Sequence, residues 1–331
     1  MCYRSLLSLG ALFVVLAAPI MAQNSSGVPR TPDGHPDLQG TWTNATVTPL
    51  ERPAALAGKA TLTDAEAKVL EAKSANELAE ADGKSEGPLL TATGSAGTGG
   101  YNALFIDRGS EFARVDGVKR TSLIIDPPDG KVPSSTPEAG RRLAASYGGS
   151  FDSVKSRPLS ERCLIGFGST SGPPMLPVLY NNNYQIVQTP DHVLILVEMV
   201  HDARIVRMNA MHAPPNVRQW LGDSVGHWEG DTLVVDTTNF LPNSISLGIM
   251  AAPVSTDKLH IVERFQRTAP NYITWTLTFD DPGVFAKPWT AEVPIRRTDD
   301  AIYEFACHEG NYSLVDILGG ARKQEGEAAH N

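Results

Sequence analysis

A dense set of acidic, basic and imidazole side chains lies in the stretch EMVHDARIVRMNAMH. His201 and Asp202 stand where an apolar strand is expected to end, and Arg204, Arg207 and His212 follow on its return. A histidine beside an aspartate suits proton transfer, because the carboxylate fixes the tautomer of the imidazole. Arginine suits a carboxylate or another oxyanion. We predict His201 or His212 as general acid or base, Asp202 as the orienting carboxylate, and Arg204 or Arg207 as the oxyanion partner.

An exposed hairpin tip whose charges merely pair with one another is the alternative for that stretch. A second polar stretch, WLGDSVGHWEGDTLVVD, makes the alternative less attractive because it adds Asp223, His227, Glu229 and Asp231. We predict His227 and Glu229 as further catalytic residues. The tripeptide EGD is also a natural tight turn, so Glu229 and Asp231 could be turn residues only.

Metal chemistry is the less favoured reading of the same histidines. His201, His212, His227 and His308 could supply three ligands together with a nearby acid. The chain lacks an H-E-x-x-H motif, and the spacing of His201 and His212 matches no standard zinc pattern. A nucleophile elbow, a P-loop and a dinucleotide fingerprint are missing as well. We therefore expect no cofactor and keep a metal site as the alternative.

The compartment follows from the N-terminus. Arg4 precedes a short apolar run over 6–18, and Ala22 is a plausible cleavage position, so residues 1–22 are predicted to be a signal peptide. No later segment has about 18 uninterrupted apolar residues, so we expect no membrane insertion after cleavage. The net charge of −9 argues against a nucleic-acid partner. The expected protein is periplasmic or secreted and meets a small-molecule substrate or ligand.

Cys163 and Cys307 are the two cysteines that remain after cleavage. In an exported protein they are expected to form a disulfide. That bond would bring the sequence ERC, with Arg162, beside HEGN, with His308 and Glu309. We predict His308 as a catalytic residue of this third polar group.

The residues expected to bind a substrate are polar or aromatic side chains beside these stretches or just before a strand. Ordinary turn chemistry is the alternative for several of them. They are Glu198, Tyr180, Asn183, Arg162, Glu309 and Trp220.

The elements that would position these groups are mainly strands. Residues 23–100 are predicted to be an N-terminal extension with a helix over 63–82 and a glycine-rich loop, and residues 101–331 a β-rich domain with a short helix over 135–147. From Tyr180 onward, alternating apolar runs and short turns predict many successive strands. Short connections favour antiparallel neighbours, and so many strands favour a β-barrel or a strongly curved sheet. The stretch LQGTW is similar to the Gly-x-Trp start of lipocalin-like (calycin) barrels.

Several longer motifs resemble those of one widespread family of secreted bacterial proteins, usually labelled hypothetical. They are RTSLIIDPPDG, EMVHDARIV, GHWEGDTLVVDTTNF and YEFACHEGNY. The resemblance implies export and points to no particular reaction. Many members of that family have Asp-Gly-Arg-Pro-His where this chain has NAMHAP, so Asn209, Ala210 and Met211 depart from the pattern while His212 remains.

These observations favour an exported enzyme that uses metal-independent His, Asp and Arg acid–base chemistry. Its reaction would be of the lyase, hydrolase or isomerase type, on a small polar organic molecule such as a sugar derivative or an aromatic. The alternative is a periplasmic small-molecule-binding β-barrel without catalysis. Tryptophans on the rim of a barrel would serve a bound ligand equally well.

Overall fold

A computed structural model describes residues 27–85, 106–147, 151–166, 172–245, 247 and 255–329. The expected signal peptide, the glycine-rich loop and most of the expected strand over 101–107 lie outside these residues. Among the described residues, no helix is long and apolar enough to cross a membrane.

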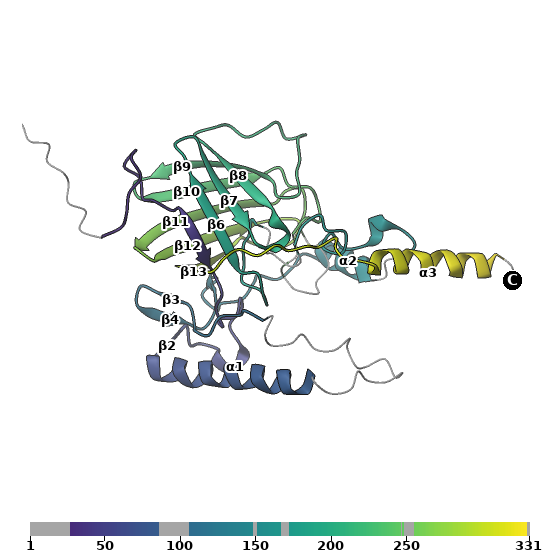
Figure 1. Ribbon diagram of the computed structural model, residues 1–331, viewed down its shortest axis with the longest axis horizontal. Coiled ribbons are helices and arrows are strands. Elements are labelled where there is room, and N and C mark those ends of the chain that lie inside the picture. Colours follow the sequence, from purple (N-terminus) through teal and green to yellow (C-terminus); the bar gives the residue numbers. More distant parts are fainter. Residues whose placement is uncertain are drawn as a thin grey trace, which may run out of the picture.

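Nine strands close into a β-barrel, which confirms the predicted fold class (Figure 1). The barrel closes because β1 pairs with β6 on one side and with β13 on the other. The strands, in their order around the barrel, are β1 Gly40–Thr43, β6 Asn183–Gln188, β7 His192–Val197, β8 Ala203–Met208, β9 Asp223–Glu229, β10 Thr232–Thr238, β11 His260–Ala269, β12 Tyr272–Asp280 and β13 Trp289–Arg297.

Smaller elements surround the barrel. The strand β5 Ile124–Asp126 pairs with β13. A second sheet consists of β2 Thr61–Leu62, β4 Val118–Arg120 and β3 Arg114–Val115. The helices are α1 Asp64–Ser85, α2 Pro137–Tyr147 and α3 Ser313–Ala328, with 3-10 turns at Ala54–Leu56, Val154–Ser156 and Met199–His201.

Side chains that alternate along the strands fill the inside of the barrel. In β12, Ile273, Trp275, Leu277 and Phe279 are fully buried, while the residues between them are partly exposed. A period of two is what a strand needs to place one row of side chains in a core. Large side chains from other strands join this row, such as Phe265, whose ring lies 6.0 Å from that of Trp275. The barrel therefore has a packed core.

The Gly-x-Trp motif lies in β1, the first strand of the barrel. Gly40 has a φ of +126°, and a Cβ atom there would lie 2.8 Å from Nη1 of Arg297. Trp42 is buried, and its indole N–H donates to the carbonyl of Leu38 at 2.9 Å. The guanidinium of Arg267 lies 5.2 Å from the Trp42 ring centroid. The barrel thus takes its first strand from the segment that we predicted as an extension.

The expectation that all neighbouring strands pair antiparallel is wrong at one position. β8 and β9 are parallel, with Val206 opposite Ser224. Parallel neighbours need a connection of about a dozen residues or more to return to the same end of the sheet. The segment over 209–222 is long enough for this return without forming a helix. It runs back along the outside of the barrel.

The first two helices begin where the sequence places them. The Glu66 carboxylate accepts a hydrogen bond from the backbone N–H of Thr63 at 3.0 Å, and the Thr63 hydroxyl accepts one from the N–H of Glu66 at 3.3 Å, which is a capping box. At α2, the hydroxyl of Thr136 accepts from the N–H of Ala139 at 3.1 Å.

The C-terminal region differs from the prediction. Residues 301–306, AIYEFA, form no strand, and α3 follows them. A strand there would need an open sheet edge, and β1, β5 and β12 already pair with the last barrel strand. α3 has no buried residues and extends away from the barrel (Figure 1).

Candidate active site

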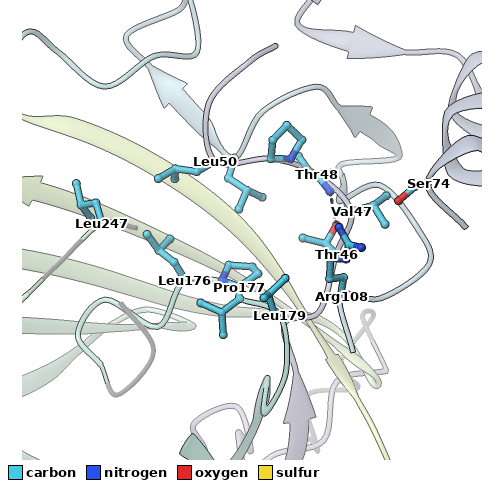
Figure 2. Close-up of a pocket in the computed structure, with 13 residues that line it drawn as sticks. Thr46, Val47, Thr48, Leu50, Ser74, Arg108, Leu176, Pro177, Leu179 and Leu247 are labelled. Atoms are coloured by element: carbon cyan, nitrogen blue, oxygen red, sulfur yellow. Dashed lines mark hydrogen bonds between the residues drawn. The ribbon is translucent and has the colours of Figure 1, made fainter. Parts of the chain in front are cut away.

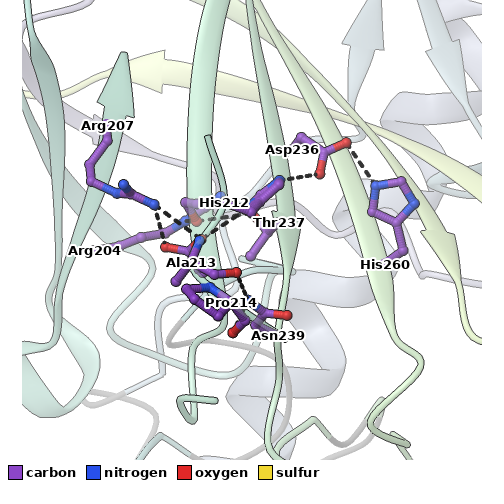
Figure 3. Close-up of polar contacts among 11 residues, drawn as sticks. Arg204, Arg207, His212, Ala213, Pro214, Asp236, Thr237, Asn239 and His260 are labelled. Atoms are coloured by element: carbon purple, nitrogen blue, oxygen red, sulfur yellow. Dashed lines mark hydrogen bonds and ion pairs between the residues drawn. The ribbon is translucent and has the colours of Figure 1, made fainter. Parts of the chain in front are cut away.

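A chain of alternating carboxylates and imidazoles crosses the outer wall of the barrel (Figure 3). Nδ1 of His212 lies 3.0 Å from Oδ2 of Asp223, and Nε2 of His212 lies 2.9 Å from Oδ1 of Asp236. Nε2 of His260 lies 2.8 Å from the other oxygen of Asp236. Arg207 donates to Asp223 at 2.8 Å. We call these five residues the outer-wall relay.

The strands and the parallel crossover together build this relay. Arg207, Asp223, Asp236 and His260 come from β8, β9, β10 and β11, at positions that alternate with core residues and therefore point outward. His212 comes from the segment over 209–222, which returns along the same wall. Had β8 and β9 been antiparallel neighbours joined by a short turn, no such segment would lie over the two carboxylates.

The relay keeps its carboxylates ionised. Burial raises the pKa of Asp223, but hydrogen bonds from Ala213, His212 and Arg207 outweigh it, and the pKa falls below its usual range. Burial likewise raises the pKa of Asp236, and the two histidines outweigh it. The hydrogen bond to Asp236 raises the pKa of His260.

His212 is held on both sides, which limits what it can do. Each of its ring nitrogens faces a carboxylate oxygen, so it must give up one contact before it can exchange a proton with a substrate. His260 contacts the relay through Nε2 only, and its side chain is 40% exposed. Of the two imidazoles in the relay, His260 is therefore the one that can exchange a proton with solvent more readily.

Asp202 occupies a different environment a short distance along the chain. Its Oδ2 atom is buried and has no hydrogen-bond partner among the described residues. Burial raises the pKa of this carboxyl group. The two residues before it, Val200 and His201, have φ values of +66° and +55°. A β-branched residue at positive φ is strained, and such strain is common at functional sites.

A pocket of about 730 Å³ opens at Asp202, beside the parallel pair of strands. We call it the outer-wall pocket. Its lining includes both charged or polar side chains and apolar ones. The side chains that matter below are Asp202, Arg207, Arg218, Trp220, Leu164 and Ile165. Since Arg207 also binds Asp223, the pocket and the outer-wall relay share one wall.

Arg204, a predicted oxyanion partner, is occupied inside the barrel. Its guanidinium forms a buried ion pair with Glu263 and donates to the hydroxyls of Ser224 and Thr237 at 3.1 Å. Trp275 donates to the same Glu263 carboxylate at 3.2 Å. The guanidinium of Arg204 is thus bound by Glu263, Ser224 and Thr237, although Arg204 is also among the residues that line the outer-wall pocket.

The strained turn is held by the chain near the C-terminus. The N–H of Phe305 donates to the His201 ring at 3.0 Å, and that of Tyr303 donates to the buried carboxylate of Glu198 at 3.2 Å. Asn183 donates to the other Glu198 oxygen at 3.0 Å. His201, Glu198 and Asn183 thus anchor the turn that carries Asp202, and none of the three lines the outer-wall pocket.

The remaining predicted residues lie in several places. Trp220 lines the outer-wall pocket. His227 contacts Glu229 at 3.2 Å on the exposed face of β9. His308 and Glu309 are exposed in a turn, Arg162 is partly exposed, and Tyr180 packs against the barrel core. Of the predicted residues, Asp202, Arg204, Arg207 and Trp220 therefore line the outer-wall pocket, and His212 belongs to the outer-wall relay beside it. The other predicted residues do not line the pocket.

The predicted disulfide between Cys163 and Cys307 is present. It joins the segment that supplies Leu164 and Ile165 to the segment that anchors the strained turn. Asn311 also donates to the carbonyl of Glu161 at 3.2 Å. The disulfide thus connects the segment that carries Leu164 and Ile165 with the segment that holds the turn before Asp202.

A second pocket, of about 260 Å³, has little to offer acid–base chemistry (Figure 2). It is lined by small polar and apolar side chains such as Thr48, Leu50 and Leu176, and Arg108 is its one charged residue. A neighbouring pocket of about 490 Å³ shares Leu50 and is lined mainly by apolar groups.

Three residues of the site escaped the sequence prediction: Asp236, His260 and Arg218. Asp236 and His260 are polar residues at outward positions of adjacent strands, and the alternation within DTLVVDTTNF and KLHIVERF carries that signal. The sequence does not predict the cluster that they form with His212, because that arrangement depends on the path of the crossover. Within the described residues, no group of three or more His, Cys, Asp or Glu is arranged to hold a metal ion.

Comparison of the sequence with models of known protein families and with curated proteins finds no match. The functional reading therefore comes from the site itself.

Proposed function

We propose that the protein is an exported enzyme that applies acid–base chemistry to a small polar organic molecule in the outer-wall pocket. The proposal rests mainly on the environment of Asp202. A carboxyl group with a buried, unpartnered oxygen and a raised pKa keeps its proton to higher pH than an ordinary aspartic acid, which suits a proton donor. Its position on a strained turn at a pocket adds to that case.

The roles follow from the surroundings of the pocket. Asp202 gives its proton to a substrate oxygen or carbon. The carboxylate that results takes up a proton in a later step, which restores the starting form of the enzyme. Arg207 stabilises negative charge that develops on the substrate. Asp223 binds Arg207 and orients it, and the outer-wall relay behind Asp223 keeps that carboxylate ionised. A lyase, hydrolase or isomerase reaction would fit these roles.

Export is supported by the apolar run near the N-terminus and by the Cys163–Cys307 disulfide. Disulfides persist in oxidising compartments, so a periplasmic or secreted location is part of the proposal. The shared motifs with secreted bacterial proteins agree with it.

A binding protein without catalysis is the second candidate. The packed core of the barrel does not favour a ligand inside it, because large rings such as those of Trp275 and Phe265 fill the centre. A non-catalytic ligand would therefore occupy the outer-wall pocket too. The two candidates differ in the fate of the ligand.

The test is untargeted mass spectrometry of a small-molecule extract incubated with three proteins: wild type, Asp202→Asn and the control Asp299→Asn. Asp299 is an exposed carboxylate outside the pocket. We expect wild type and the control to consume a compound that Asp202→Asn leaves intact. Equal conversion by Asp202→Asn would contradict the proposal, and a compound retained unchanged by all three proteins would establish the binding protein instead.

A further inference from the structure

We propose that the outer-wall pocket selects a monoanionic organic carboxylate with an apolar or aromatic body. The inference rests on the proposed function, whose substrate class it names. Two features of the pocket support the inference: the net charge of its lining residues, and the apolar side chains among them.

The charges of Arg207, Arg218 and Asp223, which line the pocket, sum to one positive charge. The ion-pair partner of Arg218, Asp257, lies outside the pocket lining. Arg204 also reaches the pocket wall, but Glu263 neutralises it within the barrel. A single positive charge matches a singly charged anion, whereas a phosphate dianion would bring an excess of negative charge into a partly desolvated site.

Two backbone carbonyls fix the position of the Arg218 guanidinium. Its Nη1 atom donates to the carbonyls of Asp257 at 2.8 Å and Phe240 at 3.1 Å. These neutral acceptors fix the guanidinium without cancelling its charge. The Asp257 carboxylate lies 3.5 Å away and is 53% exposed, so solvent screens it.

Asp202 determines which anion the pocket accepts. In its neutral form this carboxyl group can donate an O–H bond to a carboxylate, and that charge-assisted bond is stronger than one to a neutral oxygen. In its ionised form it would repel the ligand. Among the described residues, no protein group forms a hydrogen bond with Oδ2 of Asp202.

The apolar part of the pocket indicates the body of the ligand. Leu164 and Ile165 come from the disulfide-linked segment, and Trp220 and Leu241 come from the chain around residues 220–241. Aromatic and aliphatic side chains of this kind bind an apolar group, and a few polar groups then fix its orientation. A carboxylate on a ring or a short hydrocarbon has both parts.

The charged groups that line the outer-wall pocket together with Asp202 are the three arginines 204, 207 and 218 and the carboxylate of Asp223, and His201 precedes Asp202 in the chain. Asp223 has a lowered pKa and is ionised. Binding of a carboxylate should therefore weaken as the pH rises and Asp202 loses its proton.

The test measures binding by titration calorimetry on the full disulfide-bonded protein, with three probes that share one ring. We expect benzoate to bind, benzamide to bind at least about tenfold more weakly, and phenyl phosphate also to bind more weakly. Arg207→Gln and Arg218→Gln should each weaken benzoate by about tenfold or more. Arg264→Gln is the control, because Arg264 is an outer-wall arginine paired with Glu229 away from the pocket.

Asp202→Asn provides a second, independent readout. An amide cannot ionise, so benzoate affinity in this variant should fall less with rising pH than it does in wild type. Equal affinity for benzoate and benzamide would overturn the inference, and this comparison uses wild-type protein only. A benzoate affinity that neither arginine substitution changes would overturn it too.

The outcomes separate the inference from the proposed function. If wild type binds benzoate as described but converts nothing in the extract, the carboxylate pocket stands and the enzyme is contradicted. If an uncharged compound is converted and benzoate does not inhibit, acid–base catalysis stands and the carboxylate inference is overturned.

Discussion

The Nε2 atom of His212 lies 2.9 Å from Oδ1 of Asp236, although the first comes from an irregular crossover and the second from the wall of the barrel. This contact fastens the crossover to β10. Because Asp236 also binds His260, one carboxylate links the crossover with a second strand, β11.

The relay should make stability depend on pH. Asp223 and Asp236 have lowered pKa values, so they stabilise the fold above the ordinary carboxyl pKa and lose that contribution as the pH falls. His260 has a raised pKa, so its contribution is full below about pH 6.5 and is lost at higher pH. We expect Asp236→Asn to lower the free energy of unfolding by about 1 kcal/mol near pH 5.5.

Urea denaturation of wild type and Asp236→Asn at pH 5.5 and pH 8.5 measures this effect. The difference between the two proteins should shrink at the higher pH, because His260 loses its positive charge as the pH rises. A difference that is the same at both values would show that the pairing of Asp236 with His260 contributes nothing through charge.

Asp202→Asn should behave in the opposite way and stabilise the protein. A buried carboxyl with a raised pKa binds its proton more tightly in the folded state, so it costs stability as the pH rises above the unfolded value. Asparagine removes that cost. Thermal unfolding at pH 4 and pH 8 should show a gain over wild type at pH 8 that is smaller at pH 4. If the protein is an enzyme, the same substitution should lower kcat by about a hundredfold or more.

Glu263→Gln should destabilise the barrel strongly. It leaves the buried Arg204 guanidinium without its counter-charge, and breaking one side of a buried ion pair costs about 3–5 kcal/mol. The double substitution Arg204→Met with Glu263→Leu should cost much less, because it removes both charges together. Chemical denaturation of the three proteins gives the comparison, and a double variant as unstable as the single one would argue that shape outweighs charge at this position.

Removal of the disulfide should affect both stability and the pocket. Cys163 and Cys307 are separated by 144 positions, for which the chain-entropy model gives about 4–5 kcal/mol. The Cys163→Ser/Cys307→Ser variant should unfold at lower urea concentration and bind benzoate more weakly, since Leu164 and Ile165 lose their tether. Unchanged benzoate affinity in a folded double variant would show that the pocket wall is held by other contacts.

The sequence predicted the barrel and its strands well because each strand has one buried face. In β12 the row of Ile273, Trp275, Leu277 and Phe279 defines both the strand and its orientation. The capping residue Thr63 and the cysteine pair were predicted for similar reasons, since local geometry and compartment decide them.

The site was predictable only in part, because it depends on how distant segments meet. Asp202, Arg207 and His212 were identified as polar residues close in sequence. Asp236, which binds His212, comes from β10, and Arg218, which lines the same pocket as Asp202, comes from the crossover. A period-two pattern says nothing about the direction of a neighbouring strand. Arg204 illustrates the same limit, because the alternation that places it inside the barrel was visible but its partner Glu263 was not.

The pairing of β1 with β13 has a consequence for how the chain must be made. The first strand of the barrel finds its second partner at residues 289–297, so no N-terminal fragment can complete the ring. During synthesis, the edge of β1 that pairs with β13 has to wait for most of the polypeptide, and unpaired edges invite association between chains. Truncation before β13 should therefore yield aggregates in place of a smaller folded protein.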